Sequence, residues 1–294
     1  GPFSVTGQPN AMGGREVGGL ANMLANHLDI DNAGHRAAVQ GFWASPTICT
    51  KPGLKAVDLF QACAEGKIKA LWVMSTNPAV SLPDAGSVAE AIARVPFVVT
   101  SDMIEKTDTN ALADVLLPAA GWGEKNGTVT NSERRISRQR AFLEAPGEAR
   151  PDWQIVSDVA TRMGFGEAFD YQSPAEIFAE YVALDGALSP TVRDLDLSIF
   201  ADADYAEMIP TQWPRNGHRF FADGQFYHAD GKARMIAVSA PKLPRSRFAL
   251  NTGRNRDQWH TMTRTGKSRR LGAHLAEPYV EIHPVDAAEL GAEH

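Results

Sequence analysis

In the first third of the chain, segments with apolar residues at helical spacing alternate with nearly continuous apolar runs. Helical spacing predicts a helix over residues 15–28, directly after a Gly-rich turn at residues 12–14. A second helix is expected over residues 54–63, with Gly66 as its C-terminal cap. The nearly continuous apolar run at residues 68–74 then predicts a buried strand, so this helix and strand form the first unit of an alternating pattern.

The alternation of helix and strand continues along the chain. We predict a helix over residues 87–93, a strand over 97–100, a helical turn over 110–113 and a strand over 115–117. This order is typical of an α/β fold with a doubly wound, mainly parallel sheet and helices on both faces. Ligands of such sheets bind beyond the carboxyl ends of the strands, so the polar residues that follow each strand become candidates for a ligand site.

The second half of the chain has a less regular pattern. Residues 170–214 predict short helical pieces and acidic loops, and residues 219–237 predict a hairpin that turns at Asp230-Gly231. A strand-rich segment is expected over residues 248–282, followed by a helix over 284–290. We interpret this end of the chain as the start of a β-barrel that is cut before its remaining strands.

The length of 294 residues suits about two domains. We predict a partial α/β domain at residues 1–165, a connecting region at 166–240 and the truncated start of a β-barrel domain at 241–294. The opening GPFSVTGQPN has no initiator Met and is typical of the middle of a loop, so we interpret the chain as a fragment.

Charge and composition exclude several classes of protein. The net charge of -6 opposes a broad nucleic-acid or anionic-membrane surface. There is no apolar run long enough to cross a bilayer and no signal peptide, which predicts a cytoplasmic protein if the start is intact. Cys49 and Cys63 cannot form a disulfide framework or a four-cysteine metal site, and both are expected to be small buried residues. We assign no metal ligand within this chain.

The usual catalytic signatures of hydrolases, kinases and nicotinamide enzymes are missing from the sequence. Polar clusters at predicted strand ends and turns remain, and they are rich in Thr, Ser, Asn, Asp and Gly. Their chemistry suits a large, phosphate-bearing, nucleotide-like ligand. The clusters lie at residues 6–16, 75–78, 101–102, 122–127 and 251–263.

In combination and order, these clusters resemble the molybdopterin oxidoreductases that carry a bis(molybdopterin guanine dinucleotide) cofactor. The stretches GQPNAMGGREVGG and LNTGRNRDQWHTMTRTG are similar to those of assimilatory nitrate reductases. The resemblance implies a molybdenum held by two dithiolenes and one protein ligand, at which nitrate is reduced to nitrite. It also implies an upstream Cys cluster that holds a [4Fe–4S] centre. Neither that cluster nor the molybdenum ligand lies in this chain.

Two residues match the family's substrate pocket, Gln8 and Arg15. A planar guanidinium can bind a planar oxyanion through two parallel hydrogen bonds, and a helix N-terminus near Arg15 would favour an anion. The alternative is that Arg15 and Glu16 form the first exposed turn of a helix.

The resemblance also assigns cofactor contacts to the ends of two predicted strands. Thr76 and Asn77 follow the first strand, and their alternative role is a helix cap or a turn before a proline. Ser101 and Asp102 follow the next strand, where the Asp102 carboxylate could accept two N–H donors of a guanine edge. The alternative for Asp102 is again a helix cap.

Two further parts of the chain match cofactor-contacting positions. Lys125 in a Gly-rich turn matches one such position, and its alternative role is solvated surface. Asp152 matches a position near the second guanine. The segment after residue 251 combines a Gly turn with hydroxyl, imidazole and guanidinium groups, or it forms a hairpin around a buried Trp. Its matching residues are Thr252, Gly253, Arg254, Trp259, His260 and Thr261. The basic run at 264–270 could approach phosphates or an electron donor, although a solvated face is expected.

Two other functions remain open at this point. Another molybdopterin oxidoreductase, such as a formate dehydrogenase, is disfavoured by Gln8 and Arg15. A cofactor-free scaffold or electron-transfer subunit of the same fold is disfavoured because every polar cluster is populated. The implied partners are nitrate and an electron donor such as ferredoxin, flavodoxin or an NADH-linked reductase subunit, and the oligomeric state is open.

We predict that the isolated 294-residue polypeptide has no nitrate reductase activity, because the residues that bind the iron–sulfur centre and the molybdenum are implied to lie outside it. Nitrite production by this polypeptide alone with a reduced viologen dye would contradict the prediction.

Overall fold

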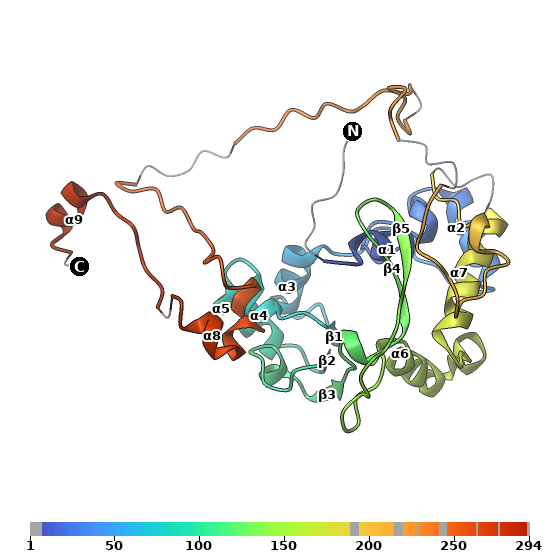
Figure 1. The fold of residues 1–294 in the computed structure, drawn as a ribbon, viewed down its shortest axis with the longest axis horizontal. Coiled ribbons are helices and arrows are strands. Elements are labelled where there is room, and N and C mark those ends of the chain that lie inside the picture. Colours follow the sequence, from blue (N-terminus) through green and yellow to red (C-terminus); the bar gives the residue numbers. More distant parts are fainter. Residues whose placement is uncertain are drawn as a thin grey trace.

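The computed structural model describes residues 8–188, 194–214, 220–228, 230–240, 246–262, 264–275 and 277–292. Two three-stranded sheets are found among these residues, one parallel and one mainly formed by an antiparallel hairpin. Figure 1 shows the parallel sheet grouped with helices α3, α4 and α5, and the hairpin grouped with α1, α2 and α7. The predicted division of the chain at residues 165 and 240 stays a prediction.

The parallel sheet contains three strands in the order β1-β2-β3, which are Leu71–Met74, Val98–Asp102 and Val115–Pro118. The register pairs Met74 with Ser101 and Ser101 with Leu117. The three predicted strands and their parallel direction are therefore confirmed, although β1 begins later than residue 68.

Helices α3 (Ala56–Ala64) and α5 (Ala85–Ala93) pack together against one face of this sheet. Both match predicted helices, and Gly66 follows α3 with a φ of +72° as expected for a C-terminal cap. Alternate residues of β1 and β2 face these helices, because side chains alternate between the faces of a strand. The apolar core of this unit consists of Phe60, Cys63, Leu71, Val73, Val88, Ala91, Ile92, Val95 and Val98. The expectation that helices cover both faces of the sheet stays a prediction.

Short helices occupy the connections of this unit. Helix α4 (Pro78–Ser81) follows β1 after a short loop and begins at a proline, whose fixed φ suits a first helical position. The 3-10 turns η2 (Asn110–Leu112) and η3 (Trp122–Glu124) lie on either side of β3.

The N-terminal helix differs from the prediction. Helix α1 spans Ala11–Glu16, so the Gly-rich residues 12–14 lie inside a helix and the predicted helix over 15–28 is wrong. Gly18 explains the early end, because it has a φ of +76° and a Cβ there would lie 2.5 Å from the backbone N of Ala25. The chain reverses at this close contact and leads to the turn η1 (Ala25–His27).

Two apolar residues of the wrongly predicted helix, Leu24 and Leu28, are buried by contacts with other helices. Leu24 and Leu28 pack against α2 (Ala33–Phe42) and α7 (Pro174–Leu188). Helix α7 has 15 residues, so residues 170–214 include a longer helix than the short pieces that the sequence predicts. Directly before α7 in the chain come α6 (Asp152–Ala160), η4 (Thr161–Phe165) and η5 (Gly166–Phe169).

The sequence analysis did not predict the antiparallel sheet. Strand β4 (Gly127–Thr130) pairs with β5 (Arg135–Gln139), and β5 pairs with β6 (Thr211–Gln212). Ile136 is the buried apolar residue of this hairpin, so the apolar alternation that identifies a strand is weak. Ile136 packs in an apolar cluster with residues of α7, η6 (Ser198–Phe200) and Trp213.

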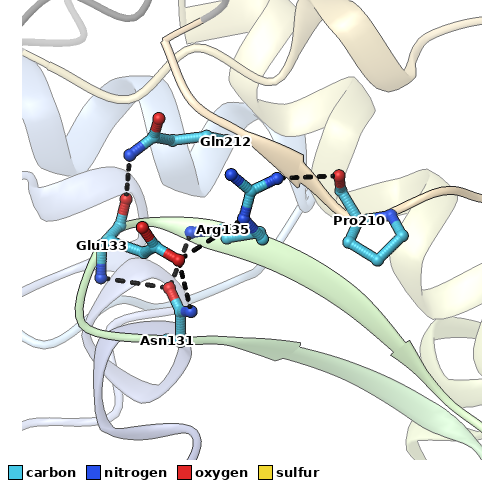
Figure 2. A network of polar contacts seen from close by, with 5 residues as sticks. All are labelled: Asn131, Glu133, Arg135, Pro210 and Gln212. Atoms are coloured by element: carbon cyan, nitrogen blue, oxygen red, sulfur yellow. Dashed lines mark hydrogen bonds and ion pairs between the residues drawn. The ribbon is translucent and has the colours of Figure 1, made fainter.

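Polar contacts at the hairpin tip hold residues 210–212 in place (Figure 2). The Asn131 Oδ1 atom accepts hydrogen bonds from the backbone N–H groups of Glu133 and Arg135, both at 3.0 Å. Arg135 donates to the carbonyl of Pro210 at 3.1 Å, and the Gln212 side chain donates to the carbonyl of Glu133 at 2.6 Å. The tip therefore fixes the chain that leads into Trp213.

The C-terminal strand predictions are wrong for the residues that the structure describes. No strand is found among the described residues of 219–237 and 248–282, while 219, 229, 241–245, 263 and 276 lie outside the description. Leu250 and Val280 are 86% and 81% exposed, and a strand without a partner leaves its backbone unpaired. The β-barrel stays a prediction.

Four short helices are found among the described residues after 248, and α9 matches the predicted helix over 284–290. Figure 1 shows α9 at the end of an extended segment, apart from the sheets. Their bounds are η7 His260–Met262, η8 Thr265–Lys267, α8 Arg269–Gly272 and α9 Pro284–Leu290.

Two other expectations can be compared with the described residues. Cys63 is buried as predicted, but Cys49 is exposed, because it lies in a segment without regular structure between α2 and α3. Among the described helices, none combines the length and apolar composition needed to cross a bilayer.

We predict that Ile92→Ala destabilises the parallel-sheet unit by about 2–5 kcal/mol, because Ile92 is fully buried in its core and the change leaves a cavity. Native-state hydrogen exchange at Leu71, whose N–H donates to the carbonyl of Phe97, measures the loss in the full-length protein. Glu90→Ala on the exposed side of the same helix is the control, with an expected change within about 0.5 kcal/mol.

Candidate functional site

The ends of β1 and β2 lie side by side, as the sequence predicts. The backbone N–H of Ser75 donates to the carbonyl of Ser101 at 2.9 Å, so Thr76 and Asp102 leave the sheet at the same edge. Thr76 is exposed at this edge. Two predicted cofactor-contacting segments, about 25 residues apart in sequence, are therefore adjacent in space.

Asn77 has a structural role at this edge. Its Oδ1 atom accepts hydrogen bonds from the backbone N–H and the hydroxyl of Thr109, at 3.2 and 2.6 Å. The Thr109 hydroxyl in turn accepts from the backbone N–H of Ala79 in α4 at 3.2 Å. Asn77 thus ties the loop after β2 to the start of α4, and any cofactor contact would have to be made by its other polar atoms.

Ser101 and Asp102 differ in their availability to a ligand. Ser101 is 1% exposed, and its hydroxyl accepts a hydrogen bond from the indole N–H of Trp72 at 2.8 Å. Asp102 is half-buried, and its Oδ1 atom accepts from the backbone N–H of Ile104 at 3.1 Å. No described residue bonds to Oδ2 of Asp102, so this oxygen can accept a donor from a ligand. The Asp102 side chain thus bonds to the backbone of the segment after β2 and does not cap a helix, and it retains an acceptor that no described residue uses.

Lys125 and Asp152 form an ion pair, which brings together two predicted cofactor residues. Lys125 follows η3, Asp152 begins α6, and the pair joins the ammonium to Oδ2 of the carboxylate. The other carboxylate oxygen, Oδ1, is buried and has no hydrogen-bond partner among the described residues. A buried acceptor without a partner is costly, so a ligand N–H group would fit at this oxygen.

The segment at residues 258–265 lies close to the strand ends. Turn η7 contacts α4, so His260 and Thr261 approach the helix that follows Asn77 although they are distant in sequence. Gln258 is buried, and its Oε1 atom accepts from the Thr265 hydroxyl at 2.6 Å. The structure thus brings two predicted cofactor segments together.

Trp259 lies in this segment but does not form the buried hairpin core of the alternative interpretation. It is 42% exposed and packs edge-on against His260, with 4.5 Å between ring centroids. Thr252, Gly253 and Arg254 are exposed in a segment without regular structure. Together with Thr261, these five residues therefore lie at the surface.

Gln8 and Arg15 lie at or near opposite ends of α1 and are both exposed. Arg15 is in the last turn of the helix, so the expected support from a helix N-terminus is wrong. No hydrogen bond or ion pair in the described part of the chain joins either residue to the cofactor positions above. The direction in which these two side chains point therefore depends on the contacts that fix α1.

Glu16, next to Arg15, is buried with 1% exposure, which contradicts the alternative in which both residues form an exposed first turn of a helix. Its Oε2 atom accepts from the Thr130 hydroxyl at 2.7 Å, and its Oε1 atom accepts from the Trp213 indole N–H at 2.8 Å. Burial raises the pKa of Glu16 above its ordinary value, although these hydrogen bonds and the nearby His27 oppose the increase.

His27 lies close to the same buried group. Its Nδ1 atom is 2.9 Å from Oδ1 of Asp194. Burial lowers the pKa of His27, but the hydrogen bond and charge of Asp194, together with Glu16, raise it to a net value above the ordinary one. The sequence analysis assigned no functional role to Glu16, Thr130, Trp213, His27 or Asp194, because their contacts join segments that are distant in the chain.

The mixed α/β fold with polar strand ends at a parallel sheet agrees with comparisons to known proteins. The model of the family described as "Molybdopterin oxidoreductase" matches residues 6–162, and the model described as "Molydopterin dinucleotide binding domain" matches residues 248–294. The chain belongs to the molybdopterin oxidoreductase family.

Relatives of the chain include nitrate reductases. It is 50% identical to "Nitrate reductase" of Klebsiella oxytoca, over 98% of this chain and 34% of that protein. It is 34% identical to "Assimilatory nitrate reductase catalytic subunit" of Bacillus subtilis, over 99% of this chain and 42% of that protein. A more distant relative is "F420-dependent formate dehydrogenase subunit alpha" of Methanocaldococcus jannaschii, 31% identical over 98% of this chain and 42% of that protein. The chain thus spans less than half the length of these relatives.

The raised pKa of Glu16 predicts a pH-dependent stability. A carboxyl group whose pKa is higher in the folded state stabilises the fold fully below its ordinary pKa of 4.5, and this contribution is lost as the pH rises through the folded-state value. We therefore expect the stability of the full-length protein, relative to Glu16→Gln, to decrease as the pH rises from 4.5. Urea unfolding midpoints of both proteins measure this difference, and a difference that does not change with pH would contradict it.

Proposed function

We propose that the protein containing this chain reduces nitrate to nitrite at a molybdenum bis(molybdopterin guanine dinucleotide) centre, in nitrate assimilation. The observation that carries the proposal is the 50% identity to the Klebsiella oxytoca nitrate reductase along almost the whole chain. The name of the Bacillus subtilis relative supports the assimilatory role. The [4Fe–4S] centre and the molybdenum ligand are expected in parts of the protein outside this chain.

The free acceptors at the sheet edge fit such a cofactor. Asp102 Oδ2 and the buried Asp152 Oδ1 could each accept an N–H group of a guanine edge, and Lys125 would keep the Asp152 carboxylate in place. Thr76 and the exposed polar groups at residues 252–261 would contact the remainder of the dinucleotides. When bound, the cofactor would supply the two-electron redox chemistry.

Arg15 would bind and orient nitrate. Its guanidinium is exposed and can donate two parallel hydrogen bonds to two oxygens of a planar oxyanion. Gln8 would add an amide donor from the segment just before α1. Both groups stabilise negative charge on the nitrate oxygens without transferring a proton themselves.

The formate dehydrogenase alternative has weaker support, because the relative of that name is 31% identical to this chain, against 50% for the nitrate reductase of Klebsiella oxytoca. A cofactor-free scaffold is disfavoured because acceptors without partners, such as Asp152 Oδ1, would be costly in a protein that binds nothing there. The electron donor, whether ferredoxin, flavodoxin or an NADH-linked reductase subunit, is left open by these residues.

We predict that Arg15→Ala lowers kcat/KM for nitrate by about 10- to 100-fold in the full-length protein, because charge-assisted hydrogen bonds to the substrate are lost. Gln8→Ala should have a smaller effect of the same sign. The measurements are nitrite production with reduced viologen and molybdenum content, which should not change.

The control for this experiment is Arg94→Ala. This change removes an exposed arginine whose guanidinium lies 3.8 Å from a carboxylate oxygen of Glu90. A parent protein that contains molybdenum but oxidises formate and ignores nitrate would refute the substrate. A parent without molybdenum would favour the scaffold.

A further inference from the structure

Helix α1 is too weak to hold its own conformation. It has six residues, AMGGRE, of which two are glycines. Isolated helices shorter than about 12 residues are marginal in water, and glycine lowers helix stability further. The direction in which α1 presents Arg15 must therefore be set by contacts with other parts of the protein.

One residue of β4 bonds to both ends of this helix. The backbone N–H of Thr130 donates to Oδ1 of Asn10, the residue before α1, at 2.9 Å. The hydroxyl of the same Thr130 donates to Oε2 of Glu16, the last residue of α1, at 2.7 Å. Thr130 is 3% exposed, so water does not compete with these hydrogen bonds. The helix is fixed along its length against the strand.

A second contact fixes Glu16 from another direction. The Trp213 indole N–H donates to Oε1 of Glu16 at 2.8 Å, and Trp213 is 1% exposed. The backbone N–H of Trp213 donates to the carbonyl of Arg134 at 3.1 Å, and the Arg134 guanidinium lies over the indole, 5.7 Å from its centroid. The polar network of Figure 2 holds the residues just before Trp213 on the same hairpin.

We propose that Glu16 is a positioning residue, which fixes the rotation of α1 and thereby directs Arg15 toward nitrate; this rests on the proposed function. Consecutive residues of a helix point about 100° apart, so a buried Glu16 leaves Arg15 outside. A rotation of α1 that redirected Arg15 would pull the Glu16 carboxylate away from two buried donors. Leaving these donors without an acceptor is costly, and the rotation is therefore opposed.

The test uses Thr130 because its side chain touches Glu16 and its backbone contact with Asn10 survives substitution. In the full-length, cofactor-loaded protein, we expect Thr130→Val to raise KM for nitrate by about three- to ten-fold with little change in kcat or molybdenum content. Thr130→Ser keeps the hydroxyl and should restore a KM close to that of the parent. Thr128→Val, the same change two residues earlier in β4, is the matched control and should leave KM unchanged.

A second measurement does not depend on nitrate. The backbone N–H groups of Gly14 and Val17 donate within α1, to the carbonyls of Asn10 and Gly13 at 2.9 and 3.1 Å. We expect their hydrogen exchange to be about three- to ten-fold faster in Thr130→Val than in the parent and Thr130→Ser. Unchanged exchange would overturn the proposal, because α1 would then not depend on the contact to Glu16.

The two measurements separate the positioning role from the proposed function. If Arg15→Ala raises KM but Thr130→Val does not, positioning by Glu16 is refuted and the role of Arg15 in nitrate binding stands. If Arg15→Ala itself leaves KM unchanged while Thr130→Val accelerates exchange, the assignment of nitrate to Arg15 fails. Faster exchange together with a raised KM in Thr130→Val, both reversed by Thr130→Ser, supports the proposal.

Discussion

The buried carboxylate of Glu16 is the interaction on which the candidate substrate site depends. It accepts hydrogen bonds from Thr130 and Trp213, and so joins α1, the hairpin and the chain after β6 at one point. A buried polar group of this kind is stable only when its partners are present, because unpaired donors and acceptors lose their bonds to water. The conformation of a short, glycine-containing helix thus depends on two distant segments, and in our proposal these contacts also set the direction of Arg15.

The candidate cofactor site follows a different constraint, which is the geometry of parallel strands. The carboxyl ends of β1 and β2 necessarily lie at one edge, where Asn77 follows β1 and Asp102 is the last residue of β2. Several polar atoms there already serve the protein, since Asn77 holds the loop at Thr109 and Ser101 accepts from Trp72. The acceptors that no described residue bonds to, on Asp102 and Asp152, are what this edge offers to a ligand. In each of these two carboxylates, one oxygen has a partner in the protein and the other has none among the described residues.

The sequence predicted elements well where one local pattern decides the outcome. The apolar run of β1, the helical spacing of α5 and the glycine after α3 each depend on near neighbours in the chain, and each was found. The hairpin β4–β5 was missed because its stabilisation comes from cross-strand bonds and from packing of Ile136, which no local spacing records. The strands expected after residue 248 failed for the opposite reason: the residues favour strands, but a strand also needs a partner edge.

The family resemblance, the parallel strands and the polar residues at their ends could all be predicted from the order and type of neighbouring residues. The burial of Glu16 beside an exposed Arg15, the pairing of Lys125 with Asp152 and the contact of η7 with α4 could not be predicted in this way. Burial and pairing depend on which distant segments exclude water from a group. Residues 16, 130 and 213 share no periodicity, and they come together through the fold alone.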